Sequence, residues 1–309
     1  MQSKQQNINK RFAAFLFSVV PILGITVYLY GVRPLIMVAI SVLIAIVSDI
    51  LVSLMRKQRY NGSDMSSIMY AVIFVLLLPA TLNYGLVAAG VVFTVFIKHA
   101  FGGYNSCIFH PSAFGFVAAA ICWPDRLFSY PATFTHIGLG VNPDTVLFDS
   151  ATYTIKGGGA PTMISRMDFI LGNHPGPLGA SFGIVIIAIL TFLIACKMTS
   201  WHVPTVYLAT IVVYAFLFPR LEVGRGDSII YEVFSDAIIF GAVYIASDPV
   251  TSPVNPKAKL IYGFLLGVAA MLFSHYGAYQ MGILFAVLLV NPISSYLDRK
   301  FVSRGRVIR

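Results

Sequence analysis

Apolar residues dominate this chain in long runs, which shorter polar segments rich in Gly and Pro interrupt. A helix that crosses a bilayer needs roughly 20 mainly apolar residues, within a range of about 17 to 25. The pattern predicts ten membrane helices, at residues 12–31, 34–54, 67–82, 84–98, 111–123, 179–197, 202–218, 229–246, 259–274 and 280–297. The fourth and fifth are short, so the stretch from Phe101 to Pro111 between them is predicted to be a broken or re-entrant segment.

Composition places the chain in the membrane class. Of its 309 residues, 58% are hydrophobic and only 11% are charged, and the mean hydropathy is +0.82. Soluble domains usually carry about 25% charged residues. These values exclude a disordered chain, a nucleic-acid binder and a secreted disulfide scaffold. The three cysteines lie in apolar stretches without a CxxC pair, which indicates small buried side chains, and no cleavable signal peptide is evident.

The basic residues predict the orientation. With ten spans both termini lie on one side, and 15 of the 21 Lys and Arg residues fall on that side. Cytoplasmic segments carry the excess of Lys and Arg, so both termini and the basic tail are predicted to be cytoplasmic. The lipid bilayer is the expected environment, and the long segment 124–178 is predicted to lie outside. Loops of that length are usually functional.

A weak internal repeat divides the chain into two halves. Several polar and proline positions recur at offsets of 170 to 181 residues: Pro34 and Pro204, Pro79 and Pro249, Asp64 and Asp236, His99 and His275, and His110-Pro111 and Asn291-Pro292. Five predicted spans separate the members of each pair, and an odd number reverses direction. The pattern therefore predicts inverted five-helix repeats at 1–123 and 179–309, joined by an outer segment at 124–178. Channels, transporters and electron carriers all fit this plan.

Three polar strings are candidates for binding. Asp248 and Thr251 lie in the string from Ser247 to Pro253, whose prolines break any helix. Gly102 and Gly103 open the matching string of the first half and allow close approach of backbone or of a flat ligand. Asn173 lies in a turn rich in Gly and Pro. The alternatives are, in the same order, a capped loop, tight helix packing and a rigid turn.

Other polar residues have simpler interpretations. Asp49 is predicted to form a structural ion pair with the nearby Arg56 and Lys57, with an ion relay as the alternative. The six histidines show no HxH or HExxH spacing, so no zinc site is expected. The outer string Asp149-Ser150-Ala151-Thr152-Tyr153-Thr154 would, on its own, be an ordinary polar loop.

Taken together, these strings resemble the RnfD/NqrB family of membrane subunits, from Rnf complexes and sodium-translocating NADH:quinone oxidoreductases. The resemblance covers about Asn61 to Asp298. The strings that carry it are the run from Asp168 to Gly179, Ser247 to Pro253, Leu260 to Gly263, Ala286 to Asn291, and Phe101-Gly102-Gly103 with Pro111.

The resemblance implies a fold, a cofactor and partners. The fold is an all-α, ten-helix membrane protein of two inverted halves, like urea transporters. The cofactor is FMN, joined through its phosphate to a threonine of an outer-loop motif by a flavin transferase, with a second flavin (riboflavin or FMN) bound non-covalently. The partners are the other membrane subunits of an Rnf/Nqr-type complex in the bacterial inner membrane, which passes electrons while Na⁺ or H⁺ moves.

Carried onto this chain, the exposed acceptor would be Thr152, next to Ser150 and Ala151, with Thr154 as the alternative. Asp149, the Tyr153-Thr154 pair, His110 and Ala180 depart from the family pattern, and the N-terminus is short. Five aromatic residues of the outer segment could stack on a flavin or anchor at the interface: Phe128, Tyr130, Phe134, Phe148 and Tyr153. The alternative functions are a small-solute channel or transporter and a cofactor-free membrane scaffold.

Overall fold

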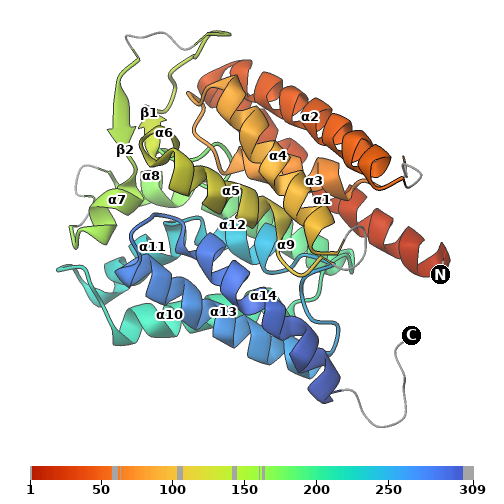
Figure 1. Ribbon diagram of the computed structural model, residues 1–309. Helices are drawn as coiled ribbons and strands as arrows, with labels where there is room; N and C mark the ends of the chain where they lie inside the picture. The colour runs from red at the N-terminus through yellow and green to blue at the C-terminus, as the bar shows by residue number, and fades with distance from the viewer. Residues whose placement is uncertain are drawn as a thin grey trace.

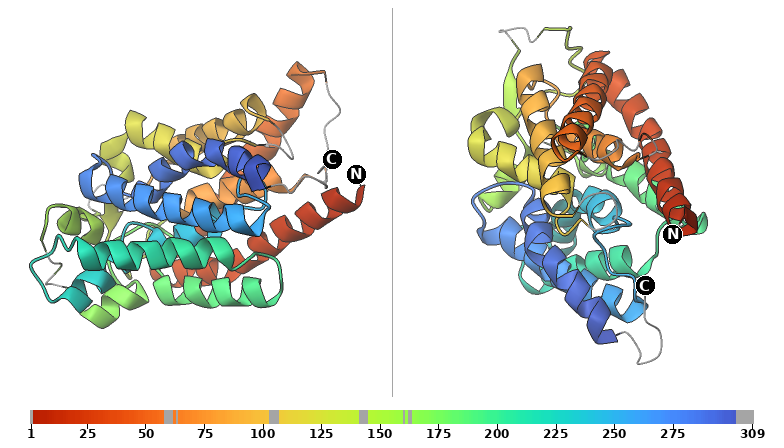
Figure 2. Two further views of the ribbon diagram at one scale, coloured as in Figure 1. Left: turned by 90° about the horizontal axis from the view of Figure 1, so that it is seen from below. Right: turned by 45° about the vertical axis from the view of Figure 1, so that its right-hand side comes forward.

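The long helices of the computed structural model run between two opposite ends of the molecule (Figure 1). The structure describes residues 2–57, 62, 64–102, 107–140, 145–159, 161 and 164–301, so Gly103 lies outside the described residues. The start of α1 and the end of α14 lie near one another at one end, and the strands with α7 and α8 lie at the other (Figures 1 and 2). We call the latter the distal end.

Three groups of elements follow one another along the chain. The first is α1 (Gln2–Tyr30), α2 (Arg33–Met55), α3 (Ser66–Leu76), α4 (Tyr84–Ala100) and α5 (Pro111–Cys122). The distal segment contains α6 (Pro124–Leu127), β1 (Ser129–Pro131), β2 (Leu147–Asp149), α7 (Ala151–Lys156) and α8 (Arg166–Leu171). The last group is α9 (Gly183–Ala195), α10 (His202–Leu217), α11 (Arg225–Phe234), α12 (Ile238–Phe240), the π-helix η1 (Gly241–Ile245), α13 (Pro256–Tyr276) and α14 (Gly282–Phe301).

The helices are those of a polytopic membrane protein. Among the described residues, three are long and apolar enough to cross a bilayer alone: Ile8–Tyr30, Arg33–Met55 and Pro256–Tyr276. The bent pair Arg225–Phe234 and Ile238–Ile245 makes a fourth candidate span. Helix occupies part of each of the ten predicted ranges, but several of these helices are only 10–17 residues long. The ten-span topology therefore stays a prediction.

The third predicted span is shorter than its hydrophobic pattern indicated. The sequence predicted a helix over 67–82, but α3 ends at Leu76, three residues before Pro79. The segment before α9 satisfies the carbonyl groups at this end, with the amides of Leu178 and Gly179 bonding Leu78 O and Leu76 O at 2.9 and 2.7 Å. A Cβ at Gly179 would lie 2.8 Å from the Leu76 Cβ, so this contact requires glycine.

The eighth predicted span is broken. The sequence predicted one helix over 229–246, but α11 ends at Phe234 and the chain bends by 57° before it continues as α12 and η1. Asp236 and Ala237 both have φ of 56° at the break, a left-handed conformation that non-glycine residues rarely adopt. Residues 235–248 are entirely buried, and so is nearly all of α3. Two short central helices are thus enclosed by the longer ones.

Corresponding helices of the two halves make matching contacts. In the first half α4 packs on α2 and α5, and in the second α13 packs on α10 and α14. Between the halves α1 contacts α9 and α5 contacts α14. The shared large core lies among these helices and around the two short central ones.

The distal end departs from the predicted all-helical fold. Strands β1 and β2 form a two-stranded antiparallel sheet, with Ser129 opposite Asp149. Arg33 at the start of α2 fixes the adjoining loop, because its guanidinium donates to the carbonyls of Ala80, Leu82 and Leu139 at 2.7 to 2.8 Å and lies over the Tyr84 ring. Arg33 is 1% exposed, and these bonds compensate its burial.

Candidate functional site

The predicted flavin motif forms the start of a short helix at the distal end. Ser150 caps α7, because its Oγ accepts from the Tyr153 amide at 3.2 Å. The same hydroxyl donates to Gln280 Oε1 at 2.5 Å, and Ser150 is buried. This bond ties α7 to the turn that precedes α14. The motif is therefore a fixed helix start, which corrects the expectation of a plain loop.

One face of α7 is anchored and the other faces outward. The anchored face belongs to a small apolar cluster of Ala151, Ile155, Phe169, Leu221 and Tyr231. On the outward face, the side chains of Tyr153 and Thr154 are exposed. Because buried and exposed positions alternate along this short helix, Thr152 contacts the protein and Thr154 faces solvent.

Thr152 lies against the break in the eighth span. It is half-buried, and its Oγ1 accepts from the Asp236 amide at 3.1 Å. The expectation of an exposed loop threonine is therefore wrong for Thr152 and holds only for Thr154. The Asp236 carboxylate in turn accepts from the amides of Met281 and Gly282, the latter at 2.8 Å. Thr152 is thus linked through Asp236 to the start of α14.

Two hollows flank this part of α7. A cavity of about 20 Å³, lined in part by Thr152, Tyr130 and Asp236, has room for about one water molecule. A second hollow, which we call the distal cleft, measures about 610 Å³ and is lined in part by Phe128, Tyr153 and Tyr279. Gln280 lines both hollows. The distal cleft has the size of a cofactor site, whereas the cavity does not.

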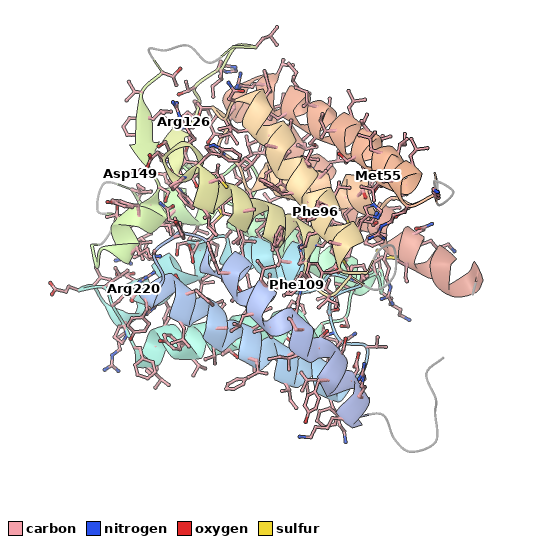
Figure 3. All side chains as sticks on the ribbon, in the orientation of Figure 1. Met55, Phe96, Phe109, Arg126, Asp149 and Arg220 are labelled. Carbon is pink, nitrogen blue, oxygen red and sulfur yellow. The ribbon has the colours of Figure 1, made fainter. Side chains whose placement is uncertain are left out.

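The distal cleft offers flat rings and charge. Phe128 stacks on Tyr279 with ring centroids 6.2 Å apart, and Tyr279 stacks on Phe285 at 5.7 Å. Lys156 also lines the cleft, and its ammonium donates to the Tyr279 carbonyl. Partial burial lowers the pKa of Lys156, and the negative charge of Asp236 opposes that shift. Figure 3 places Asp149, whose side chain also lines the cleft, at the same end as Arg126 and opposite Met55.

The remaining aromatic residues of the distal segment lie elsewhere. Tyr130 is completely buried and lines the small cavity, so it cannot anchor at an interface. Phe134 packs edge-on against Tyr28 with ring centroids 6.0 Å apart. Phe148 lines a separate hollow beside His136. Of the five aromatic residues named from the sequence, only Phe128 and Tyr153 line the distal cleft.

Asn173 belongs to the turn that ends α8. Its side-chain nitrogen donates to Asp168 Oδ1 at 3.1 Å, and its backbone amide bonds to Asp168 O at 2.7 Å. Hydrogen bonds from Ser165 and Asn173 lower the pKa of the exposed Asp168 carboxyl. These contacts are those of the rigid turn that the sequence offered as the alternative interpretation.

Asp248 and Thr251 form part of a second, buried cluster between the halves. The Asp248 carboxylate accepts from Tyr70 Oη at 3.1 Å and from the amides of Val250 and Thr251 at 3.0 and 2.7 Å. Thr251 Oγ1 is buried and has no hydrogen-bond partner among the described residues. His110, completely buried, packs edge-on against Tyr70 at 5.3 Å. Both polar strings thus meet in the interior, although Gly102 is exposed.

The C-terminal end of α4 contains a buried charge cluster that was not predicted from the sequence. The ammonium of Lys98 lies 2.7 Å from Asp64 Oδ2 and 3.6 Å from Asp49 Oδ2, and its side chain is 2% exposed. His99 Nε2 lies 2.6 Å from Asp49 Oδ1. The expected pairing of Asp49 with Arg56 and Lys57 is wrong, since Arg56 instead donates to the His99 carbonyl. Arg56 and Lys57 were expected as partners because they follow Asp49 closely in the sequence. Asp49 instead lies on the face of α2 that packs on α4, where it meets Lys98 and His99.

The second half has a charge cluster of different composition. Arg220 Nε lies 2.7 Å from Glu232 Oε1, and its Nη2 donates to Glu232 Oε2 at 3.0 Å. His275 Nε2 lies 3.5 Å from the same carboxylate. The match of His275 with His99 in the sequence was the one signal that pointed to both clusters. Among the described residues, no group of three or more His, Cys, Asp or Glu side chains could hold a metal ion.

Comparison with known proteins gives a consistent result. The profile of the NQR2, RnfD, RnfE family matches residues 2–305. The chain is 28% identical to the D-type subunit of the ion-translocating oxidoreductase complex of Actinobacillus succinogenes, over 92% of this chain and 89% of that protein. It is 28% identical to the D-type subunit of the Na⁺-translocating ferredoxin:NAD⁺ oxidoreductase complex of Acetobacterium woodii, over 92% and 86%. For the D-type subunit of the Methanosarcina acetivorans ion-translocating oxidoreductase complex the values are 27%, 92% and 87%.

Proposed function

This chain belongs to the NQR2, RnfD, RnfE family, and we propose that it is the D-type membrane subunit of an ion-translocating, electron-transferring complex. The observation that carries the proposal is a match along nearly the whole chain to relatives named as D-type subunits of such complexes, which it covers over 86 to 89% of their lengths. The partners are then the other membrane subunits of such a complex. The exposed apolar side chains of α2, such as Leu43, Leu54 and Met55, offer a surface for them or for lipid.

We further propose that Thr152 carries FMN. Its hydroxyl lies at the start of α7, and Gln280 lines both the cavity at Thr152 and the distal cleft. In this proposal Thr152 would hold the phosphate and the cleft would hold the ring. Phe128, Tyr153 and Tyr279 would pack against the ring, and Lys156 would place a positive charge beside it. Bound flavin supplies one- or two-electron transfer, while these residues position it and limit its contact with water.

The second, non-covalent flavin stays a prediction, and we propose the buried cluster at Asp248 and Thr251 for it, whereas Gly102 is exposed and lies outside that cluster. Its support is the meeting of both polar strings in the interior. Thr251 Oγ1, buried without a partner among the described residues, is a hydroxyl available to a ligand. Asn173 does not support this proposal, because its side chain is bound to Asp168 in the turn after α8. Gly103 lies outside the described residues.

We propose the predicted topology of two inverted five-helix repeats, with both termini cytoplasmic and the distal end outside the bacterial inner membrane. Two observations support it: α4 packs on α2 and α5 as α13 packs on α10 and α14, and the distal segment lies opposite the start of α1 (Figure 1). The test labels single cysteines in a chain without native cysteine, using an impermeant maleimide on intact cells. Lys156→Cys is expected to react at once and Lys57→Cys only after the cells are opened. The reverse result would contradict the orientation.

The flavin proposal is tested by co-expressing the chain with a flavin transferase and observing fluorescence in a denaturing gel. The wild type and Thr154→Ala are expected to fluoresce, and Thr152→Ala is expected to be dark. Loss of the hydroxyl that accepts from Asp236 N costs about 1 kcal/mol, so Thr152→Ala should still fold. Fluorescence lost only in Thr154→Ala would move the attachment. A dark wild type would contradict the flavin proposal and favour a solute transporter or a scaffold.

A further inference from the structure

The cavity beside Thr152 contains polar atoms that the proposed flavin does not use. Tyr130 Oη and His174 Nε2 are both buried without a hydrogen-bond partner among the described residues, and both residues line this cavity. Tyr130 is 0% exposed and His174 is 7% exposed. A buried polar group without a partner costs about 1 to 3 kcal/mol, so such groups usually face a ligand or water.

Asp236, which lines the same cavity, forms no direct ion pair among the described residues. Asp236 is 4% exposed, and no Lys, Arg or His side chain among the described residues lies within ion-pair distance of its carboxylate. Lys156 donates to the Tyr279 carbonyl and acts on the Asp236 carboxylate only beyond ion-pair distance, and Arg220 pairs with Glu232. Buried charges are ordinarily paired or bind a metal ion.

We propose that Asp236 and the Tyr130 hydroxyl bind one monovalent cation of the Na⁺ class in the cavity beside Thr152. The cavity of about 20 Å³ holds one water-sized species, which also suits a sodium ion stripped of its water. Carboxylate and hydroxyl oxygens are the ligands that hard cations prefer. The inference deepens the ion-translocating role proposed above and rests on it, but it does not depend on the flavin.

The backbone at this position suits a cation as well. Asp236 lies in the break between α11 and α12, and unwound segments of broken helices are where membrane proteins commonly bind Na⁺ or H⁺. His174 adds a lone pair, because its Nδ1 faces the Pro175 carbonyl at 3.2 Å and must donate to it, which leaves Nε2 as an acceptor. Burial lowers the pKa of His174, which keeps the ring neutral beside the site.

The test measures the thermal unfolding midpoint of the purified full chain in detergent, in NaCl, KCl or choline chloride at one ionic strength. A ligand that binds only the folded state raises the midpoint in a saturable way. We expect this rise with Na⁺ only. Asp236→Asn should abolish it, and Tyr130→Phe should raise the half-saturating Na⁺ concentration about tenfold, the effect of a single lost ligand worth about one hydrogen bond. Glu222→Gln, at an exposed distal residue, should respond like the wild type.

Equal midpoints in all three salts would overturn the site and assign the cavity to a structural water. An unchanged Na⁺ response in Asp236→Asn would also overturn it. Should Asp236→Asn fail to fold, Tyr130→Phe decides, because an unchanged half-saturation there would contradict the proposal. The Na⁺ response is measured on the chain made without a flavin transferase, and flavin fluorescence on the chain co-expressed with one. A chain that accepts flavin but whose unmodified form shows no Na⁺ response contradicts only the cation site.

Discussion

Asp64 and Asp236 each precede a short buried helix, yet their charges are compensated in different ways. Asp64 lies 2.7 Å from the ammonium of Lys98 on α4. On α13, where Ser274 precedes His275 as Lys98 precedes His99, no cation is supplied, and the Asp236 carboxylate is held by backbone amides. The carboxylate of the first half thus has a cation in direct contact, whereas that of the second half forms no direct ion pair among the described residues and borders the cavity beside Thr152. This difference is why we propose a functional role for the distal end and a structural role for the cluster around Lys98.

The largest loss of stability is expected for Lys98→Met. It would leave Asp49 and Asp64 buried without their cation, which should lower the free energy of unfolding by about 3–5 kcal/mol. Denaturant unfolding in detergent measures the change. Ser274→Ala in the second half should cost only about 1 kcal/mol, since it removes a single hydroxyl. A cost for Lys98→Met no larger than for Lys57→Met, at an exposed residue, would show that the first-half cluster is not structural.

A smaller loss is expected for Glu232→Gln. The Arg220 guanidinium would lose its carboxylate partner, but 12% of its side chain is exposed, so water compensates part of the charge. We expect a cost of roughly 3 kcal/mol at most. The same unfolding measurement applies, with Asp227→Asn as control, because Asp227 pairs with the largely exposed Arg166. Equal costs for the two variants would make the Arg220 pair no more than a surface contact.

The next largest loss of stability is expected where α5 packs closely on α4 in the first half. A Cβ at Gly115 on α5 would lie 2.0 Å from Thr94 Oγ1 and 2.9 Å from the Gly90 carbonyl on α4. Gly115→Ala should therefore cost about 1–3 kcal/mol through overpacking. Gly24→Ala on α1 meets nothing within 4 Å and should instead stabilise the helix by about 0.5–1 kcal/mol. Similar midpoints for the two variants would contradict the close contact of α4 with α5.

The smallest expected effect concerns the connecting turn between the halves. The pKa of Asp168 is lowered by hydrogen bonds from Ser165 and Asn173, so its contribution is present above the ordinary value of about 3.9 and is lost as pH falls below it. Amide exchange of α8 should accelerate only in that acid range, and Asp168→Asn should abolish the change. Acceleration that persists in Asp168→Asn would assign the effect to another group.

The hydrophobic pattern predicted where helices lie better than where they end. Pro79 and the amides of residues 178 and 179 end α3 early, and the left-handed Asp236 and Ala237 break the eighth span. Both ends depend on segments distant in the sequence, which periodicity does not report. The match of His99 with His275 pointed to two residues that each lie in a charge cluster. It could not show that Lys98 reaches Asp49 and Asp64, because a pair of matching sequence positions does not reveal which side chains meet.

The site was predicted in part. The resemblance pointed to Thr152, but the sequence indicated neither its half-buried position nor the distal cleft, since Phe128 and Tyr279 come together only through tertiary contacts. Tyr130 was expected to stack or anchor and is instead buried beside Asp236. Asp236 itself entered only as a member of the repeat, because a lone carboxylate in a sequence does not show whether a cation accompanies it.

Peptide mass spectrometry of the chain co-expressed with a flavin transferase shows directly whether Thr152 carries the flavin. We expect the peptide that contains Thr152 to carry the mass of FMN, with fragment ions that place the adduct on Thr152, and no adduct on any peptide of Thr152→Ala. An unmodified Thr152 in a fully recovered digest, or an adduct on another residue, would contradict the claim that the distal end of this protein is its electron-carrying site.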